Sequence, residues 1–338
     1  MIKNTFLGLG PMSLEVINSL DFFSKKYNKK IMLICSRNQI ESSKLGGGYV
    51  NNFSTSEFAD FVKSKKNKLL IMSRDHCGPF KRDGIKKNKE NLKKEIDNCK
   101  ISLLDDIKND FKILHIDTSE CGSAKYEIAE ELINFCNQTA KTNKKKIFFE
   151  FGCEDHGVLT NFKKFKKDAE FFSKYKNKQF IVCQTGSLVK STFQIGQFDI
   201  NSVKTMKKIA KDNGLLLKEH NCDYLNFEQI QLRKEYGINA INIAPELGSI
   251  QSNLTYNLAK KFQLDEEINS FYQFVLKKGK WKKWNYNNEN NLIKYYSAGH
   301  YHFGSKIYKT FLNKIIRKVN FQNLLNKSIE KNLIRYFN

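Results

Sequence analysis

The sequence predicts a closed parallel (β/α)8 barrel, the TIM-barrel fold, followed by a helical C-terminal extension. Short apolar segments rich in β-branched residues recur up to about residue 245, each followed by a polar turn and a longer segment with helical spacing. A barrel of this kind takes about 250 residues. Polar residues follow nearly every apolar segment, whereas a doubly wound open sheet, the alternative, gathers them at one switch point.

The apolar segments give the expected strands, and amphipathic segments between them give expected helices. The strands are Thr5–Leu9, Ile31–Ser36, Leu69–Ser73, Lys112–Ile116, Ile147–Phe151, Phe180–Cys183, Leu215–Lys218 and Ala240–Ala244. The helices are Ser13–Phe23, Ser56–Lys65, Lys125–Lys141, Asn201–Asp212 and Asn226–Glu235. Ser or Thr residues cap the first two helices.

We expect two parts, a barrel at residues 1–250 and an extension at residues 251–338 that packs on it. The strand rhythm stops after residue 250, and apolar residues such as Phe271 and Phe311 then follow helical spacing. The segment Gly299-His300-Tyr301-His302 between them is unusual for a plain helical cap.

The chain has 338 residues and a formal net charge of +23, from 58 Lys and Arg against 35 Asp and Glu. Only six of the basic residues are Arg, without the basic and aromatic stripes typical of nucleic-acid binding. A phosphorylated or otherwise anionic substrate suits the sign equally well. Residues 251–338 hold 16 Lys and Arg against 5 Asp and Glu, so an anionic partner is first sought there.

The sequence also predicts a cytoplasmic protein with reduced thiols. Apolar runs are shorter than the roughly 18 residues of a membrane-spanning helix, and the N-terminal residues do not resemble a secretory signal. The eight cysteines are scattered singly, without a CxxC pair. We therefore expect neither disulfides nor a cysteine-ligated zinc, and no membrane partner.

Histidines and carboxylates at the strand ends are the candidate metal ligands. His76 follows Asp75, His220 follows Glu219 with Asp223 behind it, and Glu154 follows another strand. A single histidine is more often a packed or surface residue, but strand ends of a barrel meet at one mouth. Two histidines plus carboxylates can hold Zn²⁺, Mn²⁺ or Co²⁺ with open positions. His115 lies inside a strand, which favours a packing role.

A guanidinium and a glycine run are candidates for binding an anionic group of the substrate. Arg74 precedes the Asp-His pair and can form two parallel hydrogen bonds with a phosphate or carboxylate. The amides of Gly46, Gly47 and Gly48 can cradle a phosphate, although a flexible turn is the simpler interpretation. The spacing matches neither a phosphate loop nor a dinucleotide fingerprint.

Taken in order, the strand-end motifs resemble the Z-type subunit family of tagatose-bisphosphate aldolases, which includes related ketose 4-epimerases. The matching segments are Ser36-Arg37-Asn38-Gln39-Ile40, Gly47-Gly48-Tyr49, Asp75-His76-Cys77-Gly78-Pro79, His115-Ile116-Asp117, Glu154, Gln184-Thr185-Gly186, Glu219-His220-Asn221-Cys222-Asp223-Tyr224 and Ile243-Ala244-Pro245-Glu246-Leu247. The resemblance implies a sugar-phosphate substrate and a site at these residues. The chain departs from the family pattern at Ser73-Arg74, and it lacks a glycine between Glu219 and His220.

From the residues and the resemblance together, we expect a metal-dependent enzyme that performs retro-aldol chemistry on a phosphorylated or acidic ketose, as an aldolase or a C4 epimerase. Asp75 is the expected base and Asp223 a second catalytic candidate, with metal ligands at His76, Asp117, Glu154 and His220. Asn38, Gln39, Gln184 and Gly186 are expected to bind substrate, with Arg74 and the glycines.

The alternative function is a non-catalytic subunit that stabilises a separate class II aldolase. A vestigial site should have lost at least one ligand, and the complete acid and histidine set therefore favours an enzyme, which can also form a homo-oligomer. A basic surface for nucleic acid or membrane is the least favoured interpretation.

Overall fold

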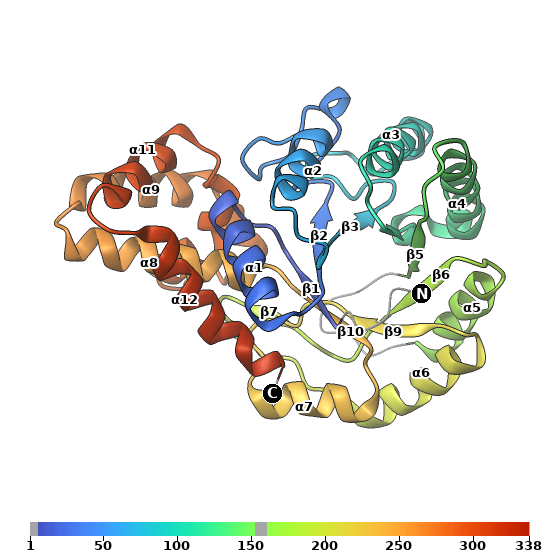
Figure 1. The fold of residues 1–338 in the computed structure, drawn as a ribbon. Coiled ribbons are helices and arrows are strands. Elements are labelled where there is room, and N and C mark those ends of the chain that lie inside the picture. Colours follow the sequence, from blue (N-terminus) through green and yellow to red (C-terminus); the bar gives the residue numbers. More distant parts are fainter. Residues whose placement is uncertain (1–5, 153–160, 338) are drawn as a thin grey trace.

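A computed structural model describes residues 6–152 and 161–337. Eight of its strands are parallel and form a closed barrel in the order β1-β10-β9-β6-β5-β4-β3-β2 (Figure 1). These strands are β1 Leu7–Leu9, β2 Ile31–Ser36, β3 Leu70–Cys77, β4 Ile113–Ile116, β5 Phe148–Phe151, β6 Lys178–Cys183, β9 Leu216–Glu219 and β10 Ala240–Ile243. The predicted barrel is confirmed, and each expected strand has a counterpart. Two further short strands, β7 Val189–Lys190 and β8 Phe193–Gln194, form a hairpin after β6.

Helices surround the barrel and continue beyond it. The α-helices are α1 Leu14–Tyr27, α2 Thr55–Ser64, α3 Lys89–Lys108, α4 Lys125–Thr142, α5 Phe162–Ser173, α6 Ile200–Asp212, α7 Phe227–Tyr236, α8 Pro245–Lys261, α9 Asp265–Lys278, α10 Asn291–Ala298, α11 Lys306–Ile316 and α12 Phe321–Leu333. Short 3-10 helices are η1 Ser43–Leu45, η2 Ser119–Ala124, η3 Lys280–Lys283, η4 Gly299–His302 and η5 Ile334–Tyr336. Side-chain caps such as Ser54, which forms a capping box with Glu57, set where the helices begin.

Two separate apolar clusters show how the strands use their two faces. Alternate strand residues point into the barrel, where a small cluster fills the interior: Met32, Ile34, Ile113, Phe180 and Ala240. Their neighbours point outward and join the larger cluster between the strands and the helices. This alternation decides which strand-end side chains reach the mouth of the barrel.

The C-terminal extension packs on the barrel through α8 and α12. Helix α8 runs continuously through residue 250, and α12 lies along α1, as Figure 1 shows. Gln322 of α12 donates a hydrogen bond to the Glu15 carbonyl oxygen of α1, and Ser19 Oγ donates to Asn326 Oδ1 at 2.8 Å. The extension therefore lies against the outer surface of the barrel, beside the first βα unit.

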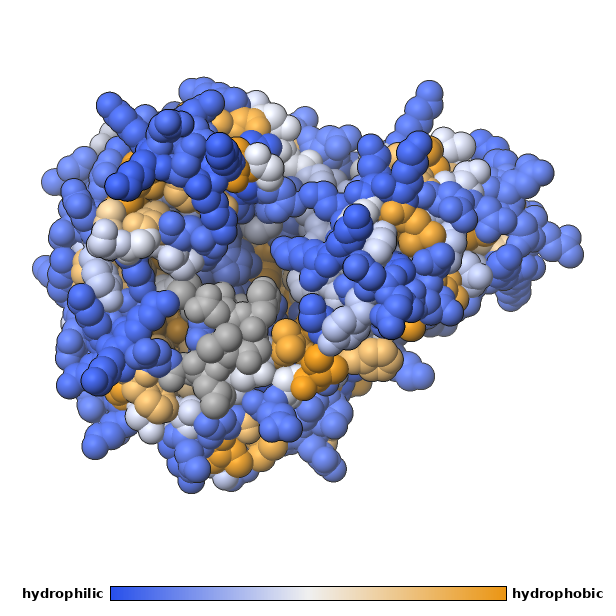
Figure 2. Space-filling model, turned by 180° about the vertical axis from the view of Figure 1, so that it is seen from behind, coloured by the Kyte–Doolittle hydropathy of each residue, from blue (hydrophilic) through white to orange (hydrophobic). Residues whose placement is uncertain are grey.

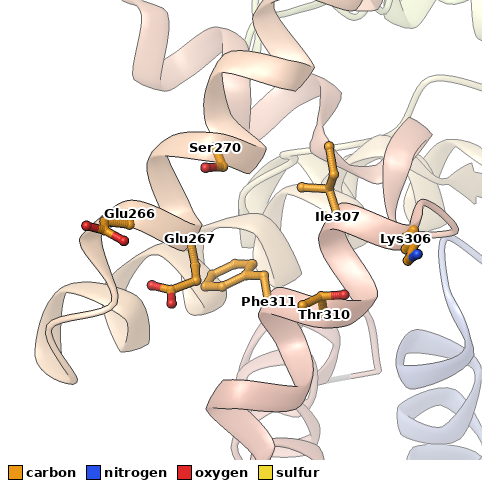
Figure 3. A pocket seen from close by; sticks show the side chains of 7 residues that line it. All are labelled: Glu266, Glu267, Ser270, Lys306, Ile307, Thr310 and Phe311. Carbon is orange, nitrogen blue, oxygen red and sulfur yellow. The ribbon is translucent and has the colours of Figure 1, made fainter.

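A shallow pocket of about 420 Å³ lies within the extension, between α9 and α11 (Figure 3). Its lining residues are Glu266, Glu267, Ser270, Lys306, Ile307, Thr310 and Phe311. They share no residue with the strand-end motifs, so this pocket is separate from the candidate site.

Two further features of the described residues concern the cysteines and the helices. Seven cysteines, all but Cys153, are described, and each is a buried free thiol. No described helix is long and apolar enough to cross a membrane.

Candidate active site

Four side chains from three strands meet at the mouth of the barrel. Asp75 and His76 come from the end of β3, His115 from β4, and His220 from just after β9. Each offers one possible ligand atom, and these atoms all lie within 4.8 Å of one another. We call these four residues the His/Asp cluster.

A backbone irregularity brings two consecutive residues of β3 to this cluster. In a regular strand, neighbouring side chains point to opposite faces. The pairing of β3 with β4 shifts register between Arg74 and Cys77, and His76 has φ = 44°. Such bulges re-aim side chains next to active sites. Gly78 follows, where a Cβ would lie 1.6 Å from the Asp117 carbonyl oxygen, so the chain can pass close to β4 here.

Each imidazole of the cluster uses one nitrogen to bond a neighbouring acceptor. His76 Nδ1 lies 2.7 Å from Asp117 Oδ2, and His220 Nε2 lies 2.6 Å from Glu150 Oε1. His115 Nε2 donates to the carbonyl oxygen of Gly152 at 2.9 Å. Such bonds fix ring orientation and tautomer in metal sites. The nitrogens that remain, Nε2 of His76 and Nδ1 of His115 and His220, face one another.

The remaining nitrogens and Asp75 also contact one another, which completes the cluster. His220 Nδ1 lies 3.3 Å from His76 Nε2, and Asp75 Oδ1 lies 3.4 Å from His115 Nδ1. The backbone N–H of His76 also donates to His115 Nδ1 at 3.2 Å. Asn242, on β10, three strands away from β3 around the barrel, donates to Asp75 Oδ1 at 3.5 Å. The possible ligand atoms of the four residues therefore surround one central position.

Basic groups around the cluster favour the ionised form of its carboxyl groups. Burial by itself raises the pKa of Asp75, yet His76 and His220 hold that pKa well below its usual range. Burial also opposes ionisation of Glu150, but Lys218 and His115 lower its pKa to about 2. Against the effect of burial, the Glu150 carboxylate raises the pKa of His115 to about 9. The carboxylates thus favour a positive charge on His115, whereas burial outweighs their effect at His220 and lowers the pKa of that imidazole.

The His/Asp cluster fits a divalent transition metal. Three imidazole nitrogens and one carboxylate are ligand types that Zn²⁺ and related ions accept. The second nitrogen of every imidazole is already bonded to an oxygen acceptor, as is typical of histidine ligands. The cluster can therefore hold a metal ion.

Reasoning from the residues placed His76 and His220 in this group but gave His115 a packing role and did not single out Glu150. The family resemblance included His115 in one of its matching segments. The alternation that puts Ile113 in the barrel interior also puts His115 there, because the two residues lie two positions apart. The same alternation turns Glu150 inward between Phe149 and Phe151. The two-residue alternation along a strand was the sequence signal that could have identified His115 and Glu150 as inward-facing residues.

Asp117, expected as a metal ligand, instead lies behind His76. It is fully buried, and its carboxylate also contacts Lys81 Nζ at 3.0 Å and the Ser119 hydroxyl at 2.7 Å. Asp117 is therefore a hydrogen-bond partner of His76 in this structure and is not one of the four residues of the His/Asp cluster. Glu154, the other expected carboxylate ligand, lies outside the described residues.

Arg74 does not reach the barrel mouth, and its expected role in binding substrate is corrected. Its side chain is fully buried on the outer face of β3 and forms two parallel hydrogen bonds with Asp106 of α3, at 2.7 and 2.6 Å. The guanidinium also donates to the carbonyl oxygens of Cys35 and Ile40. Asp75 points inward, so the preceding Arg74 points outward.

The glycine amides are also occupied. Gly46, Gly47 and Gly48 donate their N–H groups to the carbonyl oxygens of Ser43, Ser42 and Phe53. A Cβ at Gly48 would lie 2.0 Å from the Gln39 carbonyl oxygen, so a close backbone approach requires this glycine. The expected phosphate cradle at these amides is therefore wrong, because their donors already close a turn.

The remaining candidates stand in structural positions around the mouth. The Asn38 side chain accepts from the Asp83 N–H, and the Gln39 side chain accepts from the Ser36 N–H. Gln184 and Gly186 follow β6, and Gly186 has φ = 91°. Asp223 accepts N–H groups of Ala244 and Glu246 at the start of α8. It is thus placed at a helix terminus and is not a member of the His/Asp cluster.

Comparisons with known proteins give the fold but not the family. No family model and no curated protein matches the sequence. A solved structure named as a probable tagatose 6 phosphate kinase from Sinorhizobium meliloti 1021 is similar, with a TM-score of 0.82, 13% identity, and coverage of 98% of this chain and 99% of that chain. The fructuronate-tagaturonate epimerase UxaE from Cohnella laeviribosi gives a TM-score of 0.60 at 13% identity, over 98% of this chain and 81% of that chain.

A third solved structure, the fructose-bisphosphate aldolase from Campylobacter jejuni, gives a TM-score of 0.58 at 15% identity, over 98% of this chain and 89% of that chain. At such low identity these likenesses establish the fold. The chain is a TIM barrel whose architecture resembles that of proteins named as sugar-processing enzymes.

Proposed function

We propose that the chain is a metal-dependent enzyme that acts on a phosphorylated or acidic ketose by retro-aldol chemistry, as an aldolase or as a C4 epimerase. The His/Asp cluster carries this proposal, because three imidazoles from three strand ends leave one nitrogen each for a single position. The names of the aldolase and epimerase among the similar structures support the class of reaction.

In this proposal His76, His115 and His220 hold the metal through Nε2, Nδ1 and Nδ1. A bound divalent cation would polarise the ketose carbonyl and stabilise the negative charge that develops when the adjacent carbon–carbon bond breaks. Asp117, Glu150 and the Gly152 carbonyl keep the three rings in place.

In this proposal Asp75 moves the proton. Its carboxylate is ionised, lies among the three imidazoles, and accepts a hydrogen bond from Asn242. It takes the proton of the C4 hydroxyl as the C3–C4 bond breaks, and the electron pair of that bond passes to the three-carbon fragment. In cleavage, the C4 aldehyde leaves and Asp75 returns the proton to C3 of the three-carbon fragment. In epimerisation, C3 attacks the other face of the aldehyde and Asp75 returns the proton to the C4 oxygen.

The metal requirement is tested first, by elemental analysis of the purified protein and of two variants. Gln reaches the place of Nε2 and Asn that of Nδ1, so His220→Gln and His76→Asn remove the ligating nitrogen but can keep the bond to Glu150 or Asp117. We expect both to lose a stoichiometric transition metal. His302→Gln in the extension, whose ring contacts Phe274, is the matched control and should retain it.

The reaction is tested with ketose phosphates and acidic ketoses in D₂O, with Mn²⁺ or Zn²⁺. We expect C4 epimers or aldehyde products without deuterium at C4, because the C4–H bond stays intact. Deuterium at the inverted carbon would contradict the retro-aldol route. Inertness of the metal-loaded protein across the panel would instead favour the non-catalytic subunit that stabilises a class II aldolase.

A further inference from the structure

A cleft lies where the barrel meets the C-terminal extension, and we call it the α8 cleft. Its volume is about 770 Å³, and its lining comes from the β7–β8 hairpin, the loop after β9, α8, α10, α12 and η5. Ligand sites in proteins commonly have volumes of about 300–1,000 Å³. Figure 2, turned by 180° from the view of Figure 1, shows apolar atoms exposed where these two parts of the molecule meet.

One face of α8 runs along the cleft. The residues of this helix that line the cleft have the spacing of a single helix face. They are Glu246, Ser249, Ile250, Asn253, Leu254 and Asn257. Ile250 and Leu254, in the middle of this face, are half-buried. Ile293 of α10 and Phe193 of the hairpin line the same space, and Phe193 is 58% exposed. An apolar surface inside the cleft is therefore open to solvent.

Polar residues gather at the end of the cleft where α8 begins. Glu246 Oε1 lies 2.5 Å from Arg335 Nη2 and accepts a hydrogen bond from Asn332 Nδ2 at 2.6 Å. The Tyr224 hydroxyl lies 2.8 Å from Ser249 Oγ. These bonds connect α8 to η5, to α12 and to the loop after β9. The polar end of the cleft is therefore held in place by several elements of the fold.

Arg335 keeps unused hydrogen-bond donors at this end. Its Nη2 contacts both Glu246 and the Tyr336 hydroxyl, whereas its Nε has no hydrogen-bond partner among the described residues. A guanidinium has five N–H donors, and those of Nη2 are only two of them. The side chain is also 26% exposed. An anionic group that enters the cleft can therefore still form a hydrogen bond with Arg335.

The lining of the α8 cleft carries an excess positive charge. Its charged residues are Glu246, Lys331 and Arg335, and the glutamate pairs with the arginine. Lys331, an exposed residue of α12, has no carboxylate within ion-pair distance in the described part of the chain. Two other hollows have an acidic excess: the pocket of Figure 3 is lined by two glutamates and one lysine, and one between α1 and α12 by Glu15 alone among charged residues. The α8 cleft thus differs from both in favouring an anion.

We propose that the α8 cleft is a binding site for a small organic anion with an apolar body. Lys331 and Arg335 bind the anionic group, and the apolar body packs against Leu254, Ile293 and Phe193. The cleft shares no residue with the His/Asp cluster. This site goes beyond the proposed function, because it uses neither the metal nor the retro-aldol reaction.

The first test measures binding of two fluorescent probes to the full-length protein after treatment with EDTA. Anilinonaphthalene sulfonate joins an aromatic body to one anionic group, and phenylnaphthylamine has a similar body without a charge. Both fluoresce more strongly in apolar surroundings. We expect each probe to bind at one saturable site, and added NaCl should weaken binding of the anionic probe alone. Failure of both probes to saturate a site would overturn the proposal.

The second test locates the probes with exposed and half-buried variants. Lys331→Glu should weaken binding of the anionic probe roughly tenfold and leave the neutral probe unchanged. Lys306→Glu makes the same charge change at the pocket of Figure 3 and is the matched control, which should change neither affinity. Leu254→Gln should weaken both probes severalfold. Phe193→Ser should do the same to a smaller extent, and its exposed position keeps the test valid if Leu254→Gln does not fold.

The outcomes separate this site from the proposed active site. Equal weakening by Lys331→Glu and Lys306→Glu, or wild-type binding of both probes in the Leu254 and Phe193 variants, would overturn the α8 cleft. His220→Gln, which removes a proposed metal ligand, should bind both probes as the wild type does. A loss of probe binding in His220→Gln would place the probes at the barrel mouth and contradict the cleft. Absence of a metal from the purified protein would contradict the proposed function and leave the cleft unaffected.

Discussion

Arg74 and Asp75 are neighbours on β3, yet their side chains lie in two different regions. Arg74 points outward and pairs with Asp106 of α3, and both are fully buried. Asp75 points into the mouth and joins three histidines. The end of β9 repeats the pattern, since Glu219 pairs with Arg233 of α7 and His220 joins the cluster.

At the same strand ends, outward-facing residues therefore contribute to stability and inward-facing residues to the chemistry of the site. The outward pairs hold helices onto the barrel, and nearby carbonyl oxygens and hydroxyls complete their hydrogen bonds. The inward residues leave nitrogens aimed at one position. Substitutions on the outer face should therefore affect unfolding, and those on the inner face should affect metal binding.

The largest effect is expected on the outer face. Arg74→Met leaves the buried Asp106 carboxylate without its partner, which should reduce the free energy of unfolding by about 3–5 kcal/mol. Urea unfolding measures this loss. The double variant Arg74→Met/Asp106→Leu should recover part of it, because both charges are then gone. Wild-type stability in the single variant would contradict the structural role of Arg74.

On the inner face, His115→Gln should weaken metal binding by more than roughly 100-fold. This exceeds the 10–100-fold loss that is typical when a hydrogen-bond partner of a metal ligand is removed. Gln can still bond the Gly152 carbonyl but offers no atom at the place of Nδ1. His115→Asn is the matched variant, since its amide lies near that place. Zn²⁺ affinity is measured by chelator competition, and unchanged affinity in His115→Gln would remove His115 from the ligand set.

A smaller effect is expected from the residue that orients a ligand. Asp117→Asn should weaken metal binding by about 10–100-fold, because the hydrogen bond to His76 Nδ1 loses its charge. The same chelator competition measures it, with Ser119→Ala as a control for the loss of a neighbouring hydroxyl. A loss as large as that of His115→Gln would indicate that Asp117 binds the metal directly.

The smallest effect concerns an ion pair on the outer surface. Burial opposes ionisation of Asp110, but Lys145 and Lys63 lower its pKa to about 2. Its stabilisation is present above pH 3.8 and is lost as the pH falls through about 2. Asp110→Asn should therefore cost up to about 1 kcal/mol at pH 7 and nothing near pH 2. A pH-independent difference in urea unfolding would contradict this assignment.

Most of the barrel could be predicted from the sequence. Strands such as Ile31–Ser36 are short apolar runs followed by a turn, a pattern that the local sequence shows directly. The site could be predicted only where polar residues follow a strand, as His76 and His220 do. His115 and Glu150 were harder to find, because they lie within strands, where a polar residue is easily mistaken for a packed one.

The sequence by itself determined the order of strands and helices, the barrel and the strand ends that supply its mouth. Only the tertiary structure decided which side chain of each strand end faces inward, because one bulge at His76 changes that direction. It likewise decided that Lys280 of the extension pairs with Asp83 in the loop after β3, since a contact between residues so far apart in the chain depends on packing that no local pattern records.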